Sequence, residues 1–150
     1  MNALPEMGQI NGHEHGLPVR VYYEDTDFSG VVYHAAYLKF MERGRTEALR
    51  ATGTGHQDLL LQNPPLAFVV RGMQLSFHAP ARIDDALLVR TRFFEATGAR
   101  MRAEQTVDCA DQVLVSAVLE LACIDLDGRP KRIPKDMLAK MKLFLCDKPT

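Results

Sequence analysis

The alternation of apolar and polar positions predicts that most of the chain is β-structure. From residue 66 onward, long segments rich in apolar side chains follow one another, and several alternate apolar with polar residues, as half-buried strands do. These segments are 66–77, 86–96, 100–108 and 112–125. Short turns containing Gly or Asp separate most of them, which is typical of antiparallel hairpins. An earlier β-branched and aromatic run, residues 19–23, predicts a fifth strand.

One long segment, residues 34–51, instead has the period of a helix. Apolar or small residues recur at spacings of four, three, four and three, which defines one helix face. The residues of this face are Tyr37, Met41, Gly44, Ala48 and Ala51. The opposite face carries Lys39, Glu42, Arg43, Thr46 and Arg50. Because most of the first face is small, we expect it to lie close against a sheet, and two following glycines to end the helix.

The remaining segments complete an α+β arrangement, with one long helix packed on an antiparallel sheet of about five strands. A short helical turn is predicted at 56–62, and a last helix after Pro134. Residues 1–17 have no period, so we predict a flexible N-terminal arm followed by a single domain, residues 18–150. One helix leaves part of such a sheet uncovered, and we therefore expect an oligomer.

Composition narrows the class of protein. The 150 residues include 18 Lys and Arg against 19 Asp and Glu, and this net charge of −1 argues against a basic nucleic-acid binder. No apolar run approaches the roughly 18 residues of a membrane span, so we expect no transmembrane segment. The cysteines Cys109, Cys123 and Cys146 cannot all pair within one chain and lack metal-ligand spacing. They predict reduced thiols and a cytoplasmic location.

The candidate chemistry lies in residues 22–34, where the fifth strand meets the long helix. This segment holds three carboxylates, three tyrosines and His34. A helix N-terminus offers unpaired amides and the positive end of a dipole, which can polarise a carbonyl oxygen. A nearby carboxylate can attack that carbonyl or activate a water. Gly30 would let the backbone turn sharply between the two.

Simpler interpretations of the same residues stay open. Asp25 and Asp27 are equally explained as turn caps, and His34 as an ordinary polar residue. A calcium loop lacks its later ligands, and His13 and His15 have no evident third ligand, so we predict no metal site. The motifs of serine hydrolases and of nucleotide-binding loops do not occur in the sequence.

A resemblance to a known family adds to this interpretation. The motif Val21-Tyr22-Tyr23-Glu24-Asp25-Thr26-Asp27, then Gly30-Val31-Val32-Tyr33-His34 with Tyr37, Phe40 and Glu42, resembles the hotdog-fold acyl-CoA thioesterases. The nearest group is the YbgC type, associated with the Tol-Pal system and related to 4-hydroxybenzoyl-CoA thioesterases. Further similarity occurs at Pro80-Ala81, Asp84-Asp85, Gly128-Arg129-Pro130 and Ile133-Pro134. The resemblance covers about residues 18–145 and implies a hotdog fold, a long central helix wrapped by the sheet.

The resemblance implies roles for three residues. Asp27 stands where the family has its catalytic carboxylate, which attacks the thioester carbonyl or activates a water. The backbone amide of His34 would polarise that carbonyl, and its imidazole would bind the substrate or orient Asp27. Tyr23 is a weaker candidate for positioning the substrate. Since a thiol pKa of about 8.5 makes thiolate a good leaving group, no metal or redox cofactor is implied.

The resemblance also implies an acyl-CoA substrate with a short-chain or aromatic acyl group, and a homodimer or homotetramer with the substrate tunnel at the dimer interface. An acyl carrier protein is a further candidate partner. Arg129, Lys131 and Arg132 are candidates for binding the CoA phosphates, with a solvated basic turn as the alternative, and Arg82 is a weaker candidate. Ala36 departs from the small polar residue of many relatives, which puts a local hydrogen bond in doubt.

Two other functions remain as alternatives. A hotdog hydro-lyase acting on hydroxyacyl thioesters would need a histidine and an acidic residue in a different arrangement. A non-catalytic protein that binds acyl carriers, or a scaffold of the cell envelope, would not need the pair Asp27 and His34, whose presence weighs against it.

Overall fold

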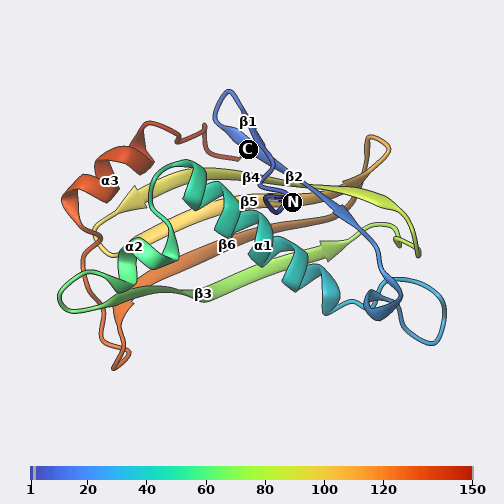
Figure 1. Cartoon of the computed structure of the whole chain (residues 1–150), viewed down its shortest axis with the longest axis horizontal. Helices are drawn as coiled ribbons and strands as arrows, with labels where there is room; N and C mark the ends of the chain where they lie inside the picture. The colour runs from blue at the N-terminus through green and yellow to red at the C-terminus, as the bar shows by residue number, and fades with distance from the viewer. Residues whose placement is uncertain (2, 150) are drawn as a thin grey trace.

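A six-stranded antiparallel sheet with one long helix lying across it makes up most of the molecule (Figure 1). The structure, a computed structural model, describes residue 1 and residues 3–149. The strands are β1 (Gln9–Asn11), β2 (Glu14–Arg20), β3 (Leu66–Phe77), β4 (Ala86–Thr97), β5 (Arg100–Cys109) and β6 (Gln112–Asp125), in the sheet order β1-β2-β4-β5-β6-β3. The helices are α1 (Ala36–Ala51), α2 (His56–Leu60) and α3 (Lys135–Lys142). The predicted α+β architecture is confirmed, with six strands where about five were expected.

The sixth strand comes from the segment that was expected to be an irregular arm. That expectation is wrong for residues 9–17, which form β1 and the beginning of β2. Gly12, with a φ of +67°, allows the tight turn between them. The imidazole of His15 is buried, and its Nε2 lies 2.9 Å from the carbonyl oxygen of Met7. β1 is only three residues long, Gln9, Ile10 and Asn11, which is too short for an alternating pattern to reveal the hairpin.

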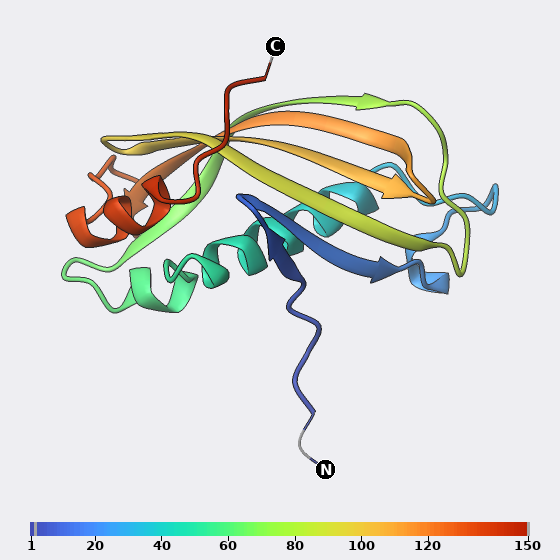
Figure 2. The ribbon, with the colours of Figure 1, turned by 90° about the horizontal axis from the view of Figure 1, so that it is seen from above.

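The long helix lies as close to the sheet as its small residues suggested (Figure 2). A Cβ atom at Gly44 would lie 2.6 Å from Cγ1 of Val89 in β4, so only glycine fits there without a shift. Met41 and Ala48 are buried on the same face, whereas Ala51, the last helical residue, is exposed. This close packing fixes the axis of α1 relative to the strands.

The chain leaves the sheet before the two tyrosines that were predicted to end the strand. β2 stops at Arg20, and residues Tyr23–Asp25 form one turn of 3₁₀-helix. The side-chain Oδ2 of Asp25 accepts a hydrogen bond of 2.8 Å from the backbone N–H of Tyr22. Asp25 is therefore a turn cap, as one of the two sequence interpretations held.

Two clusters of buried apolar side chains form the core, one toward each end of α1. The first contains Tyr37, Phe40 and Met41 from the helix, and the second contains Leu49 together with Met137 and Met141 of α3. Strand β3 pairs only with β6 and so forms one edge of the sheet. In the described part of the chain, no helix is both long and apolar enough to cross a membrane.

Candidate active site

The loop that carries Asp27 is held by backbone hydrogen bonds. The backbone N–H of Asp27 donates to the carbonyl oxygen of Val31 at 2.9 Å, and the N–H of Gly30 donates to the carbonyl oxygen of Asp27 at 3.0 Å. Gly30 has a φ of +83°, a conformation that favours glycine. Thr26 and Val32 form a β-bridge that closes the loop. The sharp turn predicted at Gly30 is therefore present.

The carboxylate of Asp27 is fixed and ionised by Ser29. Its Oδ1 accepts one hydrogen bond of 2.6 Å from the Ser29 hydroxyl and another of 2.8 Å from the Ser29 backbone N–H. These two bonds lower the pKa of Asp27, and the nearby charge of His34 lowers it further. The side chain is exposed, and among the described residues no group donates to Oδ2. Asp27 therefore caps a turn with one oxygen and leaves the other free for chemistry.

His34 lies where the chain enters α1. The backbone N–H of Tyr33 donates to Asp25 and that of Ala36 donates to Tyr33, at 2.9 and 2.8 Å. Between them, the backbone N–H of His34 has no acceptor within residues 1 and 3–149. The imidazole is exposed, with its ring centre 6.5 Å from that of Phe77 at the end of β3. The structure therefore brings Asp27 and His34 together, with a free N–H donor at the helix N-terminus.

The structure gives Tyr23 no comparable position. Its side chain is 84% exposed, and its phenol makes no hydrogen bond within the described residues. Tyr37 is the tyrosine with a defined role, because its buried hydroxyl accepts a 3.0 Å hydrogen bond from the backbone N–H of Ala81. Burial raises the pKa of Tyr37, so the phenol stays protonated. Its place on the sheet-facing side of α1 was predictable, but its hydrogen bond was not.

The basic residues proposed for CoA lie at the other end of the sheet. Arg129 follows β6, and its backbone N–H donates to Oδ1 of Asp125 at 2.9 Å. Asp125 pairs with Leu66 at the beginning of β3, whereas His34 contacts Phe77 at its end. Because β3 has 12 residues, these ends are about 36 Å apart. One copy of the chain therefore does not bring Arg129, or the neighbouring Lys131 and Arg132, to Asp27.

Arg82 lies much nearer to the Asp27 loop. It forms a β-bridge with Val31, and its backbone N–H donates to Oδ2 of Asp85 at 2.8 Å. Its side chain is exposed. Among the four basic candidates, Arg82 is the one placed beside the candidate active site within the same copy.

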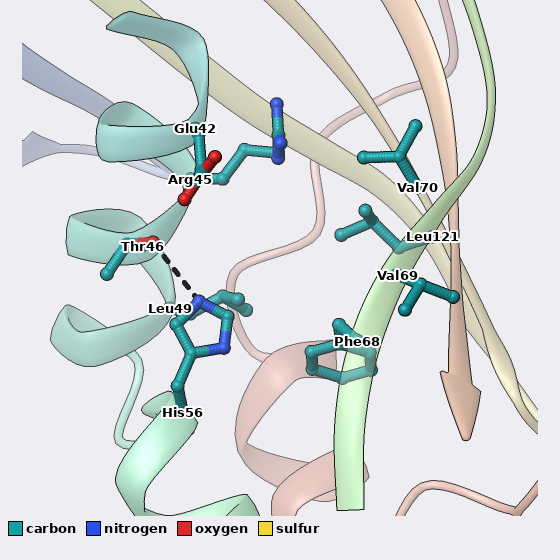
Figure 3. A pocket seen from close by; sticks show the side chains of 9 residues that line it. All are labelled: Glu42, Arg45, Thr46, Leu49, His56, Phe68, Val69, Val70 and Leu121. Carbon is teal, nitrogen blue, oxygen red and sulfur yellow. Dashed lines mark hydrogen bonds between the residues drawn. The ribbon is translucent and has the colours of Figure 1, made fainter. Parts of the chain in front are cut away.

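A cavity of about 310 Å³ opens between α1 and β3, farther along the helix from Asp27 (Figure 3). Its helical side is polar, with Glu42, Arg45 and Thr46 from α1 and His56 from the beginning of α2. Its other lining residues are apolar: Leu49, Phe68, Val69, Val70 and Leu121. The Thr46 hydroxyl and Nε2 of His56 are 3.1 Å apart. The cavity thus combines polar groups on one wall with an apolar surface on the other.

The buried polar group of this cavity is Arg45, which the helical pattern did not single out. Its Nη1 donates to Oε1 of Gln105 at 3.1 Å. The amide nitrogen of Gln105 in turn donates to the backbone carbonyl of Met41 at 2.9 Å and to the hydroxyl of Thr91 at 2.8 Å. Burial lowers the pKa of Arg45, and the charge of Glu42 opposes this shift. The available signal was Gln105, a polar residue in the apolar half of an alternating strand.

The His, Cys, Asp and Glu side chains are not arranged as a metal site in the part of the chain that the structure describes, because no three of them are grouped so as to hold a metal ion. His13 is engaged otherwise, with its Nδ1 2.9 Å from the carbonyl oxygen of Leu145. All three cysteines are free, as predicted, and burial raises the pKa of Cys123 to about 11.

Sequence comparisons connect this arrangement with known proteins. Residues 29–116 match the family model described as the thioesterase superfamily. The chain is 46% identical over 124 residues to the acyl-CoA thioesterase YbgC of Haemophilus influenzae, covering 82% of this chain and 90% of the relative. It is 42% identical over 127 residues to the acyl-CoA thioester hydrolase YbgC of an Escherichia coli strain, covering 83% and 93%.

Solved structures agree with these relatives. A probable thioesterase from Bartonella henselae superposes with a TM-score of 0.78 at 46% identity, over 81% of this chain and 99% of that one. A hypothetical protein from Thermus thermophilus gives a TM-score of 0.81 at 26% identity, over 89% and 99%. The helix, the sheet and the loop that joins them are therefore arranged as in these proteins.

Proposed function

Because the chain belongs to the thioesterase superfamily, among the YbgC acyl-CoA thioesterases, we propose that it hydrolyses acyl-CoA thioesters to a free acid and CoA. Short-chain or aromatic acyl groups are the proposed substrates. The observation that carries this function is the pairing of an ionised, oriented Asp27 carboxylate with the unpaired N–H of His34.

The geometry supports a short reaction sequence. The thioester oxygen accepts a hydrogen bond from the His34 N–H, which stabilises the negative charge that develops on it. The free Oδ2 of Asp27 either attacks the carbonyl carbon, giving a mixed anhydride that water then cleaves, or removes a proton from an attacking water. The thiolate of CoA is expelled as the anhydride forms in the first route, or from the tetrahedral adduct with water in the second, and it is then protonated by solvent. We propose that no metal or redox cofactor takes part, because thiolate leaves without assistance.

A thiol-release assay on a panel of acyl-CoA thioesters tests this function. The panel contains short straight, branched and aromatic acyl groups, and the released CoA is trapped by a chromogenic disulfide. We expect turnover on at least one class. Absence of turnover on every thioester would support the non-catalytic, acyl-carrier-binding protein. Conversion of hydroxyacyl-CoA to enoyl-CoA without release of thiol would support the hydro-lyase.

We further propose that the active form is a homodimer, which can pair into a tetramer. The outer edge of β3 has no partner strand within the described chain and exposes Val69, Val70 and Phe77. Exposed apolar edge strands favour pairing with another strand. If two copies of β3 pair antiparallel, the end that carries Arg129, Lys131 and Arg132 in one copy lies beside Asp27 of the other. The CoA phosphates would then bind basic residues of the second copy.

A charged residue on the β3 edge tests the dimer. We expect Val70→Lys to shift the molecular mass in solution from dimer to monomer and to reduce thioester hydrolysis together with it. Leu143→Lys, which replaces an exposed apolar residue at the end of α3, is the matched control and should leave both unchanged. A fully active monomeric Val70→Lys protein would contradict a site shared between copies.

The three unpaired thiols also support a cytoplasmic location, which we propose on that ground. An acyl carrier protein as a thioester donor is a further proposal, since it presents acyl groups on the same pantetheine thiol as CoA.

A further inference from the structure

Arg45 is a buried cation whose hydrogen-bonding capacity is only partly used. The residue is 8% exposed, and its one hydrogen bond goes to the neutral amide of Gln105. Within the described residues, no carboxylate lies within ion-pair distance of its guanidinium. A guanidinium has five N–H donors, and burying its charge without a partner costs free energy. The remaining donors face the cavity between α1 and β3 (Figure 3).

The side of the cavity that faces β3 suits an aliphatic or aromatic chain. The side chains of Phe68, Val69 and Leu121 form its apolar wall opposite Arg45. Its volume of about 310 Å³ is at the small end of ligand pockets. A ligand that places carbon atoms against β3 and an anionic oxygen against Arg45 would satisfy both walls.

The cavity lies along the same helix as the proposed catalytic pair. Ala36, the first residue of α1, and Arg45 are separated by about 14 Å along the helix axis. Side chains of a helix point toward its N-terminus, so the guanidinium reaches back toward the end that carries His34. Within one copy, Tyr37, Met73 and Leu75 are packed between that end of the helix and the cavity. The antiparallel dimer proposed above instead places the beginning of β3, and with it the cavity, beside Asp27 of the second copy, so an acyl chain bound at that copy's site can reach Arg45.

We propose that this cavity binds the far end of the acyl group and that Arg45 selects acyl groups ending in a carboxylate. The substrate class is then the CoA thioesters of dicarboxylic acids. This inference rests on the proposed thioesterase function and names the substrate of that site. Arg45 is the specificity-determining residue, and Gln105 is a positioning residue that holds the guanidinium through its own bonds to Met41 and Thr91.

The carboxylate of Glu42 should weaken the binding of a carboxylate-ended acyl group in this cavity. This exposed carboxylate lines the same cavity, and its charge acts on Arg45 without forming an ion pair. A like charge beside a bound carboxylate weakens its binding. Removing that charge should therefore lower KM for a carboxylate-ended substrate and leave KM for an uncharged one unchanged.

The experiment compares matched substrates on the full-length protein. Succinyl-, adipyl- and suberyl-CoA are each paired with the branched isostere in which an isopropyl group replaces the terminal carboxylate. We expect kcat/KM for the best dicarboxylic thioester to exceed that of its isostere at least ten-fold. In Arg45→Met this ratio falls to about one, mainly through a higher KM, while hydrolysis of the isosteres continues. Arg50→Met removes an exposed charge from the same helix and should keep the ratio.

Three results would overturn the inference: equal rates on both members of every pair, a preference that survives Arg45→Met, or a higher KM for dicarboxylic substrates in Glu42→Gln. The last variant alters an exposed residue and keeps the test available if Arg45→Met fails to fold. Hydrolysis of the isosteres without any carboxylate preference would overturn this inference alone. Absence of hydrolysis on all substrates would instead contradict the thioesterase function.

Discussion

Asp27 and Arg45 are two charged side chains near the same helix that are held in opposite ways. Asp27 is exposed, and its partner Ser29 is two residues away in the chain. Arg45 of α1 is buried, and its partner Gln105 is 60 positions away on β5. The exposed carboxylate keeps its hydration, so a local turn is enough to orient it. The buried guanidinium has lost its hydration, so only the assembled sheet can supply its partner.

Because of this difference, we expect Asp27 to affect the reaction and the Arg45–Gln105 network to affect the stability of the fold. A change at Asp27 should alter the reaction and leave the fold intact, because its loop is closed by backbone hydrogen bonds. A change in the Arg45–Gln105 network should weaken the packing of α1 on the sheet.

Asp27→Asn should reduce kcat/KM for the best acyl-CoA by roughly 10²-fold or more, because an amide is neither a base nor an effective nucleophile. The amide oxygen still accepts the Ser29 N–H, so the free energy of unfolding should stay close to that of the parent. Steady-state thiol release and urea unfolding measure the two quantities. Parent-like hydrolysis would exclude Asp27 from the mechanism, and a large loss of stability would show that the loop depends on its charge.

Gln105→Leu should have the reverse profile and lower the free energy of unfolding by about 3 kcal/mol. The substitution removes one acceptor from Arg45 and one donor each from the Met41 carbonyl and the Thr91 hydroxyl, and it places an apolar side chain against these buried polar groups. Urea unfolding measures the loss. Gln74→Leu, at an exposed position of β3, is the control and should stay within about 0.5 kcal/mol of the parent. A stable Gln105→Leu protein would mean that the network contributes little to the packing of α1.

The same difference explains how much the sequence could predict. The site around Asp27 is built from thirteen consecutive residues, 22–34, so its motif and the strand-to-helix junction were visible in one segment. The ranges of β3 and β6 also followed from their apolar patterns. The partner of Arg45, by contrast, depends on how β5 is registered against β4 and on the approach of α1 at Gly44. No local pattern contains that information.

The hairpin of β1 and β2 was not predicted, and Tyr23 lies in a 3₁₀ turn instead of the strand that was predicted for it. β1 is a strand of three residues, Gln9–Asn11, whose conformation comes from pairing with residues 14–16 and not from its own pattern. Tyr23 matched a family position, but its direction depends on the cap that Asp25 forms with Tyr22. Both features depend on hydrogen bonds donated by backbone N–H groups, which leave no pattern of apolar and polar side chains in the sequence.

Ser29→Ala should have a moderate effect that is confined to the pH profile. The hydroxyl of Ser29 is the main cause of the lowered pKa of Asp27, so its removal should raise that pKa toward the ordinary value. Because Asp27 acts as a carboxylate, the acidic limb of kcat/KM should move to higher pH, and activity near neutral pH should change little. The pH dependence of thiol release measures the shift. A shift to lower pH would contradict the role of this hydrogen bond, and an unchanged limb would assign the limb to another group.

Tyr23→Phe should have the smallest effect, because the phenol makes no hydrogen bond within the described chain and lies almost wholly in solvent. We expect the free energy of unfolding to stay within about 0.5 kcal/mol of the parent and kcat/KM to change less than about two-fold. Tyr37→Phe is the matched comparison, since the same atom there accepts a buried hydrogen bond from Ala81 and its loss should cost about 1 kcal/mol. A large loss of activity in Tyr23→Phe with unchanged stability would place this hydroxyl against the substrate, which would require a contact that only ligand or a second copy can supply. Tyr23, which is exposed in a single copy, would then be part of the active site of the assembled dimer.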